Sequence, residues 1–292
     1  MTNPRADRVR DVAKLAGRSA RARRRQFLAE GPQAVREALR LDATRRGSGS
    51  EPVVDELYAS EACLERYPEI ADLAEATGRL RRADDAVLAA MADTVNPQGI
   101  VAVCRMLDVP LGDVLGRRPR LLAAMCRVQD PGNAGTILRA ADSAGADAVV
   151  LTASSVDIYN PKAVRSTAGS LFHVPVVLGV TAEELAGAAR SAGLGILAAD
   201  GEGTLDLDAL QDESAARRAG AAAPTGAGAG AYRLEDPTAW LFGNEAQGLD
   251  DAEKALADHR VAVPLYGAAE SLNVGTAATV CLYASARSQR RS

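Results

Sequence analysis

The sequence predicts an α/β protein in two parts: a small α/β domain first, then a larger domain built on a mostly parallel sheet. Short apolar runs bounded by turn residues alternate with segments of helical periodicity, and this alternation is typical of βαβ units. A stretch at 110–120 that contains Gly, Pro and several Arg separates two such blocks. The length of 292 residues and the hydrophobic content of 47% suffice for a buried core in each part.

The first part spans residues 19–105 and follows a basic segment at 1–18 that we expect to be a disordered tail. Proline is favoured in the first turn of a helix, so Pro32 should open a helix directly after a short strand. The elements expected in this part are strands at 27–31, 53–58 and 99–104 and helices at 32–41, 62–76 and 84–92.

The second part, residues 120–292, follows a linker expected at 106–119. Residues 214–231 are largely Ala and Gly, so they cannot bury enough apolar surface to order themselves, and we interpret them as a low-complexity surface insertion. The elements expected in this part are strands at 121–126, 148–152, 174–177, 195–199, 240–242 and 259–263 and helices after Asn133 and at 182–191, 252–257 and 272–287.

The formal net charge of −4 is unevenly distributed along the chain. Residues 1–46 contain 13 Arg and Lys against 5 Asp and Glu, a net charge of +8 that leaves −12 for the remainder. A basic end of this kind is the expected electrostatic footprint for a phosphate backbone. A solvated basic tail that binds nothing in particular would have the same composition, so the charge by itself leaves both readings open.

Several classes of site are not supported. Cys63, Cys104, Cys126 and Cys281 are widely separated and the chain has only two His, so we expect neither a disulfide framework nor a metal site. The aromatic content of 3% argues against any nucleic-acid binding that relies mainly on bases stacked on an aromatic platform. No run of about 18 apolar residues occurs, and we expect a cytoplasmic protein that does not enter a membrane.

Two glycine-rich turns near the carboxyl end form the strongest candidate site: GNEAQGLD at 243–250 and VPLYGAAESLNVG at 263–275. Each follows a short apolar run that indicates the end of a buried strand, where ligands of open α/β sheets bind. Glycine lets the backbone approach a ligand closely, and Glu245, Ser271 and Asn273 would supply directional polar groups. The structural alternative is that glycine only closes the turns and that Ser271 is the N-cap of the last helix.

A third polar cluster lies upstream in DPGNAGTILRAADSAGA at 130–146. Asn133 is a natural N-cap for the helix that follows, and Gly135 and Arg139 share one face of it because they are four residues apart. A small residue one turn before a long cation would let another chain approach that face and meet the guanidinium. Taken alone, Arg139 is equally well explained as a surface residue of an amphipathic helix.

These three motifs, in this order and at this spacing, resemble those of the SpoU/TrmH family of RNA 2′-O-ribose methyltransferases, in the SPOUT class, over about 121–287. NPKAVRSTAG at 160–169 resembles a further helix of that family. RRRQFLAEGPQAVREAL at 23–39 resembles the start of its N-terminal domain, which has the fold of an RNA-binding large-subunit ribosomal protein. The resemblance implies an α/β substrate-binding domain, a SPOUT domain with a C-terminal trefoil knot, S-adenosylmethionine as cofactor and an obligate homodimer.

Carried over position by position, the resemblance also implies which residues form the site. The methyl-transfer centre would contain Asn133, Arg139, Glu245, Ser271 and Asn273, with the first two often supplied by the partner subunit. The cofactor would be held, mainly through backbone groups, by Ala199, Gly243, Asn244, Val263, Leu265 and Leu272. RNA would be bound by Arg21, Arg23, Arg24, Arg25, Lys162 and Arg165, and no metal is implied.

The implied reaction is an in-line displacement in which a ribose 2′-hydroxyl attacks the methyl group of a sulfonium. The protein must align the oxygen, remove its proton and stabilise the developing charge. The resemblance implies that Arg139 removes this proton. A guanidinium stays protonated throughout the accessible pH range, so the alternative is that Arg139 binds the adjacent phosphate and lowers the pKa of the hydroxyl while solvent takes the proton. We expect large-subunit ribosomal RNA as the substrate. The alternatives are transfer RNA, an antibiotic-binding site on the ribosome, and a non-catalytic RNA-binding protein of the same fold.

Overall fold

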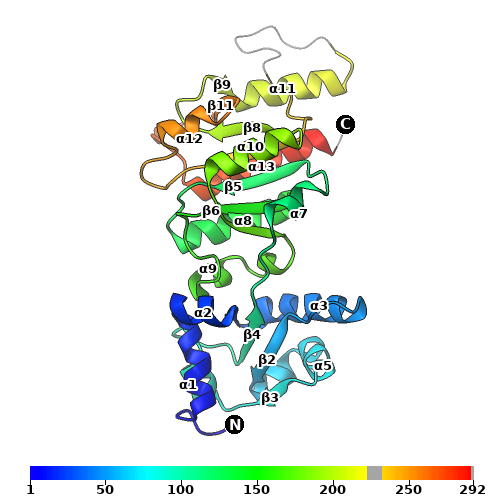
Figure 1. Cartoon of the computed structure of the whole chain (residues 1–292), viewed down its shortest axis with the longest axis vertical. Helices are drawn as coiled ribbons and strands as arrows, with labels where there is room; N and C mark the ends of the chain where they lie inside the picture. The colour runs from blue at the N-terminus through cyan, green and yellow to red at the C-terminus, as the bar shows by residue number, and fades with distance from the viewer. Residues whose placement is uncertain (222–231, 291–292) are drawn as a thin grey trace. The chain divides into compact units, whose positions relative to one another are not determined.

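The structure is a computed structural model that describes residues 1–221 and 232–290. Contacts between residues divide the chain into two compact units, Met1–Leu107 with Asp157–His173 and Asp108–Val156 with Val174–Ser292. Each unit has its own sheet and its own buried cluster, and Figure 1 labels most of their helices and strands. In the described residues no helix is long and apolar enough to cross a membrane.

The first unit contains a four-stranded mixed sheet in the order β1, β4, β2, β3. The central strand β4 runs antiparallel to β1 and β2, whereas β2 and β3 are parallel. All five residues from Ile100 to Cys104 are buried, which explains why this strand is a continuous apolar run rather than an alternating one. The strands are β1 (Gln26–Glu30), β2 (Val54–Ala59), β3 (Leu80–Arg82) and β4 (Ile100–Arg105).

Helices cover this sheet. Val12 of α1 and Leu88 of α6 pack in one buried cluster with Leu28 and Val101 of the strands, while α3 packs against β1, β4 and α5. The helix predicted to open at Pro32 does so, because the ring sets the backbone angle that the first helical turn needs. The helices are α1 (Asp7–Ala13), η1 (Lys14–Ala16), α2 (Arg18–Arg24), α3 (Pro32–Gly47), α4 (Glu61–Arg66), α5 (Pro68–Ala76) and α6 (Asp85–Met91).

Residues 1–18 are not a disordered tail. They contain α1 and η1, and Val9, Val12 and Leu15 are at most 1% exposed. These three apolar residues recur at a spacing of three, so they form one stripe on a helical surface that is otherwise charged. The prediction was wrong because it weighed the arginines of this segment and overlooked the apolar stripe between them.

Residues 157–173 also differ from the sequence-based division, because their contacts lie with the first unit. The Phe27 ring packs on Tyr159 with ring centroids 4.7 Å apart. The Leu107 backbone N–H donates to the Tyr159 hydroxyl at 2.6 Å. The sequence-based division assigned this segment to the second domain because strands of that domain flank it along the chain. Its aromatic residues are instead buried in the core of the first unit. The segment contains α9 (Pro161–Ser166) and η2 (Ser170–Phe172).

The second unit is built on a seven-stranded sheet in the order β7, β6, β5, β10, β8, β11, β9. Every pair of neighbouring strands is parallel, so all seven carboxyl ends lie at one edge. Strands β5, β6 and β7 follow one another toward one edge of the sheet, and the strands β8 to β11 all lie on the other side of β5. Open sheets bind ligands where the strand order reverses in this way. The strands are β5 (Leu121–Met125), β6 (Ala148–Thr152), β7 (Val176–Val180), β8 (Gly195–Ala199), β9 (Leu205–Asp206), β10 (Thr238–Phe242) and β11 (His259–Ala262).

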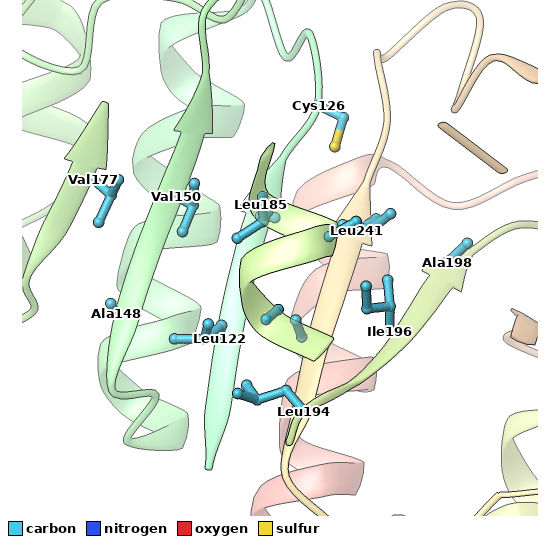
Figure 2. Packing of buried hydrophobic residues seen from close by; sticks show 14 of the residues in the cluster. Leu122, Cys126, Ala148, Val150, Val177, Leu185, Leu194, Ile196, Ala198 and Leu241 are labelled. Atoms are coloured by element: carbon cyan, nitrogen blue, oxygen red, sulfur yellow. The ribbon is translucent and has the colours of Figure 1, made fainter. Parts of the chain in front are cut away.

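Helices lie on both faces of this sheet. Figure 2 shows α10 over one face, where its Leu185 packs in a buried cluster with Leu122, Val150 and Leu241 of the strands. Behind the sheet, α13 packs against α8 and β10, and the buried Trp240 indole donates to the Ser285 hydroxyl at 2.9 Å. The helices are α7 (Leu111–Leu115), α8 (Pro131–Ala144), α10 (Ala182–Ser191), α11 (Leu207–Arg218), α12 (Asp251–Ala255) and α13 (Val274–Gln289).

Two segments of the second unit are more ordered than predicted. The expected linker at 106–119 contains α7, whose Val114 is 5% exposed and belongs to the second core. The expected insertion at 214–231 begins inside α11, where the fully buried Ser214 hydroxyl donates to Ser288 at 3.0 Å. Residues 222–231 of that insertion lie outside the described part of the chain. Both boundaries were placed by composition, which does not report the few apolar or polar contacts that order a short helix.

Arg21 should be a major contributor to the stability of the first unit. This residue is 2% exposed, donates to Asp157 at 2.7 and 3.0 Å, and donates to the carbonyls of Leu15 and Ala16. Arg21→Ala would leave a largely buried carboxylate and two carbonyls without these donors, at a cost of about 3–5 kcal/mol. Arg23→Ala, on the exposed face of the same helix, should change the free energy of unfolding by less than about 0.5 kcal/mol. Urea unfolding measures both, and equal effects would contradict this role.

Candidate active site

Three loops meet at the carboxyl edge of the parallel sheet. They follow β5, β10 and β11, at residues 126–130, 243–250 and 263–273. Strands β5 and β10 are direct neighbours, and β8 alone separates β10 from β11. Because parallel strands end at the same edge, loops far apart in the sequence are brought together there.

One hydrogen-bonded network joins all three loops. Glu245 accepts from the backbone N–H of Asp130 at 2.9 Å and of Gln129 at 3.1 Å, and from the Asn133 side-chain amide at 3.2 Å. The Asn273 side-chain amide in turn donates to Asn133 Oδ1 at 2.9 Å. The predicted residues Asn133, Glu245 and Asn273 are therefore held as one unit.

The helix caps differ from the prediction. Asp130, not Asn133, is the N-cap of α8, since its carboxylate accepts from the Asn133 backbone N–H at 2.9 Å. Asn273, not Ser271, caps α13 through bonds from the N–H groups of Gly275 and Thr276. With Asp130 as the cap, the Asn133 side chain is left to bridge Glu245 and Asn273. The sequence offered several capping residues, and only the backbone geometry selects among them.

Hydrogen bonding lowers the pKa of Glu245. Burial acts to raise this pKa, but the backbone N–H donors of Asp130 and Gln129 and the Asn133 amide outweigh it. The pKa is therefore held below its usual value and the group is a carboxylate at neutral pH. Its oxygens point at donors of the protein, which fits a positioning group better than a proton acceptor.

The turn at 243–250 is closed tightly. A Cβ at Gly243 would lie 2.2 Å from the Gly248 carbonyl carbon, so only glycine fits there. Asn244 and Gly248 exchange two backbone hydrogen bonds, and the Asn244 side-chain oxygen accepts from two N–H groups within the turn. Its amide donates to the Arg127 carbonyl at 3.0 Å. The side chain, the backbone N–H and the backbone C=O of Asn244 are thus all hydrogen-bonded within the turn or to Arg127, and its role in cofactor binding stays a prediction.

Arg127 is a site residue that the sequence analysis missed. Its guanidinium forms a two-point ion pair with Glu253 of α12 at 2.9 and 2.7 Å, and its Nη2 lies 3.3 Å from a carboxylate oxygen of Asp250. The hydrogen bonding that Arg127 donates to Glu253 is the main reason that the pKa of Arg127 is raised. Arg127 stands in the left-handed region at φ 58° and fixes the 243–250 turn to the loop after β5. A lone arginine after an apolar strand carries no sequence signal for this role.

The other predicted methyl-transfer residues lie near this network but are not bonded to it. Arg139 is exposed on α8, and within the described chain its guanidinium has no hydrogen-bond partner. Ser271 is exposed in the loop before α13. The structure therefore unites three of the five predicted residues and leaves these two as exposed side chains of the same unit.

The loop at 263–273 supplies groups that could hold a cofactor. The backbone of residues 264–272 makes no hydrogen bond to the rest of the described chain, so its N–H and C=O groups are available to a ligand. Val263 and Leu272 are partly exposed and Leu265 is 40% exposed, and Ala199 ends the neighbouring strand β8. Apolar side chains beside free backbone groups match a flat heterocycle such as adenine. No cluster of metal-ligating residues occurs among the described residues.

The predicted RNA-binding residues, all in the first unit, have different roles. Arg21 is buried and paired with Asp157, so a direct contact with RNA is not open to it. Arg24 donates to the Asp11 carbonyl, and Arg165 pairs with Glu30 and Asp93. A count of arginines cannot distinguish a cation that serves the fold from one that faces solvent. The side chains that are exposed are those of Arg23, Arg25 and Lys162.

This geometry defines a two-unit α/β protein whose second unit presents a polar network and free backbone groups at the switch point of a parallel sheet. Residues 120–283 match the SpoU rRNA Methylase family, and residues 28–110 match the family described as RNA 2'-O ribose methyltransferase substrate binding. The first match covers more than half of the chain. The chain belongs to the SpoU rRNA methylase family.

Relatives and solved structures agree with this assignment. The chain is 34% identical over 279 residues to the 23S rRNA (guanosine(2553)-2'-O)-methyltransferase RlmP of Bacillus subtilis, covering 94% of both chains. The AdoMet-bound rRNA methyltransferase of Sinorhizobium meliloti superimposes with a TM-score of 0.77 and 27% identity, covering 98% of this chain and 97% of that one. The SpoU methyltransferase AviRb of Streptomyces viridochromogenes in complex with AdoMet gives 0.76 and 29%, covering 99% of both.

Removing the Arg127 side chain should loosen the 243–250 turn. Glu253 is 9% exposed at its side chain and Arg127 25%, so Arg127→Ala should lower the free energy of unfolding by about 2 kcal/mol, between the values for exposed and buried pairs. Amide hydrogen exchange at Asn244 and Gly248 should accelerate. Arg190→Ala is the control, since its pair with Asp258 in the same unit is more exposed. Unchanged exchange in Arg127→Ala would show that the turn is held by other contacts.

Proposed function

We propose that this protein transfers the methyl group of S-adenosylmethionine to a ribose 2′-hydroxyl of large-subunit ribosomal RNA. The observation that carries the proposal is the network of Glu245, Asn133 and Asn273, which joins three loops at the sheet edge. The substrate follows from relatives, since RlmP and a Streptomyces viridochromogenes protein 29% identical over 278 residues are both named 23S rRNA 2'-O-methyltransferases.

The loop at 263–273 would hold the cofactor. The unpaired backbone of residues 264–272 can hydrogen-bond the adenine edge, and Leu265 and Leu272 can cover its faces. The backbone of Gly243, Asn244 and Ala199 borders the same edge of the sheet. When bound, the cofactor supplies an activated methyl group on a cationic sulfur. Two solved relatives are described as bound to AdoMet, which supports this choice.

The residues of the chain would align and activate the ribose oxygen. Glu245 holds Asn133 in place, and Asn133 and Asn273 fix the geometry of the two helix starts next to the attacking oxygen. Arg139 carries a permanent charge, so it would bind the neighbouring phosphate and stabilise the developing alkoxide rather than accept its proton. Ser271 is exposed in the cofactor loop and would orient the ribose. Solvent would take the proton.

The proposal includes the assembly that the family resemblance implies. Residues 19–105 would bind the RNA, and residues 120–292 would form a SPOUT domain with a knotted C-terminal segment and pair with a second copy. The match of residues 28–110 to a substrate-binding family supports the first point. Exposed Val280 and Tyr283 on α13 are available to a second copy. The protein would act in the cytoplasm, on RNA of the ribosome.

Cofactor binding is tested by titration calorimetry of the full-length protein with S-adenosylmethionine and with its demethylated product. We expect saturable heat with both ligands, because the free backbone groups of the 263–273 loop are present before binding. Absence of heat in folded protein would refute the proposed function. Mapping of 2′-O-methyl positions in ribosomal and transfer RNA then identifies the substrate. A protein that binds the cofactor and RNA without transferring methyl groups would favour the non-catalytic alternative.

Arg139→Ala should reduce methyl transfer by about 100-fold or more, since it removes a charge aimed at the reacting oxygen. The affinity for S-adenosylmethionine should stay within a few-fold of the wild-type value. Arg287→Ala, which removes another exposed arginine of the second unit, is the matched control and should retain activity. Single-turnover transfer of labelled methyl groups measures the rates. Loss of cofactor affinity in Arg139→Ala would instead assign this side chain to the cofactor pocket.

A further inference from the structure

A pocket in the first unit shares no lining residue with the methyl-transfer site of the second unit. It lies where β1 ends and α3 begins, and the loop before β4 and the segment around α9 complete its wall. Its volume is about 230 Å³, below the range of roughly 300–1,000 Å³ that is usual for sites enclosing a drug-sized ligand. One flat group, rather than a whole nucleotide, fits a space of this size. We call it the amide pocket, for Gln33, Asn96 and Gln98 in its lining.

A buried carboxylate builds the wall of the amide pocket. The Glu30 side chain is 2% exposed and accepts from the backbone N–H groups of Asp93 and Thr94 at 2.8 and 3.2 Å. It also accepts from Arg165 Nη1 at 2.9 Å. Glu30 therefore fixes both the loop before β4 and the guanidinium of Arg165. Such an arrangement makes the pocket a preformed feature of the unit.

The lining combines apolar walls with unused amide groups. Gln33, Asn96 and Gln98 are exposed, and their side chains have no hydrogen-bond partner in the described chain. Each side-chain amide presents a donor and an acceptor side by side, as the edges of nucleobases do. Gly31 stands at φ 85° with its Cα against Gln98, where a Cβ would lie 2.8 Å from the amide oxygen. The apolar wall is formed by Ala34, Ala92, Pro97, Ile100, Val101 and Ala168.

The charges of the pocket favour a neutral ligand over a phosphate. Arg165 is the cation of the lining, and it is paired with Glu30 and with Asp93 at 3.2 Å. A guanidinium neutralised twice has little attraction left for an anion. Its planar group remains 32% exposed and can stack on a base, in a pocket whose lining contains no aromatic ring.

A neighbouring groove offers a path for the RNA backbone. It shares Gln33 and Gln98 with the amide pocket and is also lined by Arg36 and Arg40 of α3. Arg36 and Arg40 are paired with the groove residues Glu69 at 2.6 Å and Glu37 at 2.8 Å. Within the described chain the Arg40 side chain has this one ion-pair partner and is 58% exposed, so it can exchange the carboxylate for a phosphate at little cost. A strand lying in this groove would present one base to the amide pocket.

We propose that the amide pocket binds a single unpaired nucleobase of the RNA substrate. The proposal rests on the proposed function in taking RNA as the ligand. Recognition of one base flipped out of a helix would let the first unit select a loop or bulge rather than a regular duplex. Single-stranded loops and bulges are where proteins read RNA sequence, because a base in a duplex has its pairing edge occupied.

The test measures binding of fluorescent RNAs to the full-length protein without cofactor. The probes are unpaired homopolymers of A, C and U of about 12 nucleotides and a hairpin duplex of similar length. Gln33→Ala and Gln98→Ala should each weaken binding of at least one unpaired probe about five-fold, with duplex binding unchanged. Gln98→Trp, which fills the pocket, should weaken it at least as much. Asn3→Ala, an exposed amide of the same unit outside the pocket, is the matched control.

Two readouts separate base recognition from other effects. The loss in Gln33→Ala and Gln98→Ala should be equal at all salt concentrations, because no phosphate contact is removed. Unchanged affinity for every unpaired probe, or an equal loss for the duplex, would overturn the proposal. Methyl transfer by the wild-type protein is measured separately. If the wild-type protein transfers methyl groups but neither Gln33→Ala nor Gln98→Ala changes RNA binding, the amide-pocket proposal is refuted and the proposed function is not. If the wild-type protein transfers no methyl groups but both variants weaken RNA binding, the proposed function is refuted and the base-binding pocket is not.

Discussion

The carboxylate of Glu245 accepts hydrogen bonds from two backbone N–H groups and one side-chain amide, and the rest of the site depends on this arrangement. These bonds link the turn after β10 directly to the start of α8. Because a charged acceptor strengthens each of these bonds, the single exposed residue Glu245 can position Gln129, Asp130 and Asn133. Asn133 passes the constraint on to Asn273 and so to the start of α13.

The parallel sheet provides what this network requires. Seven strands with the same direction place their carboxyl ends at one edge, and the reversal of strand order brings the loops after β5, β10 and β11 together. Two groups then fix the local geometry. Gly243 permits a backbone approach that any Cβ would block, and Arg127 connects the turn to α12. The loop at 263–273 is the exception, since its backbone between 264 and 272 is left without partners in the described chain.

In the first unit, buried charged residues also hold segments together that are far apart in the sequence. Arg21 joins α2 to the segment at 157–173, and Glu30 fixes the loop before β4 together with Arg165. Buried charges of this kind are tolerated only when hydrogen bonds satisfy them. They account for part of the positive charge at the amino-terminal end that composition alone associates with RNA. Of the cations predicted to bind RNA, Arg23, Arg25 and Lys162 are exposed.

The sequence by itself determined the α/β class and the parallel sheet of the second unit. Apolar runs and glycine-rich turns are local features, and local features report strand ends and close backbone approaches. Asn133, Glu245 and Asn273 were named from the family resemblance of their motifs. The structure brings their side chains into one hydrogen-bonded network, and their roles in the reaction stay predictions. The segment at 1–18 was misjudged because its composition hid a helical stripe.

Only the tertiary structure decided which polar group performs which task. It assigned the capping of α8 to Asp130, the ordering of the 243–250 turn to Arg127 and the interior of the first unit to Arg21. It also placed residues 157–173 with the first unit. The physical reason is that a polar side chain bonds to the partner that lies within hydrogen-bonding distance. Which partner that is depends on how segments far apart in the sequence pack together.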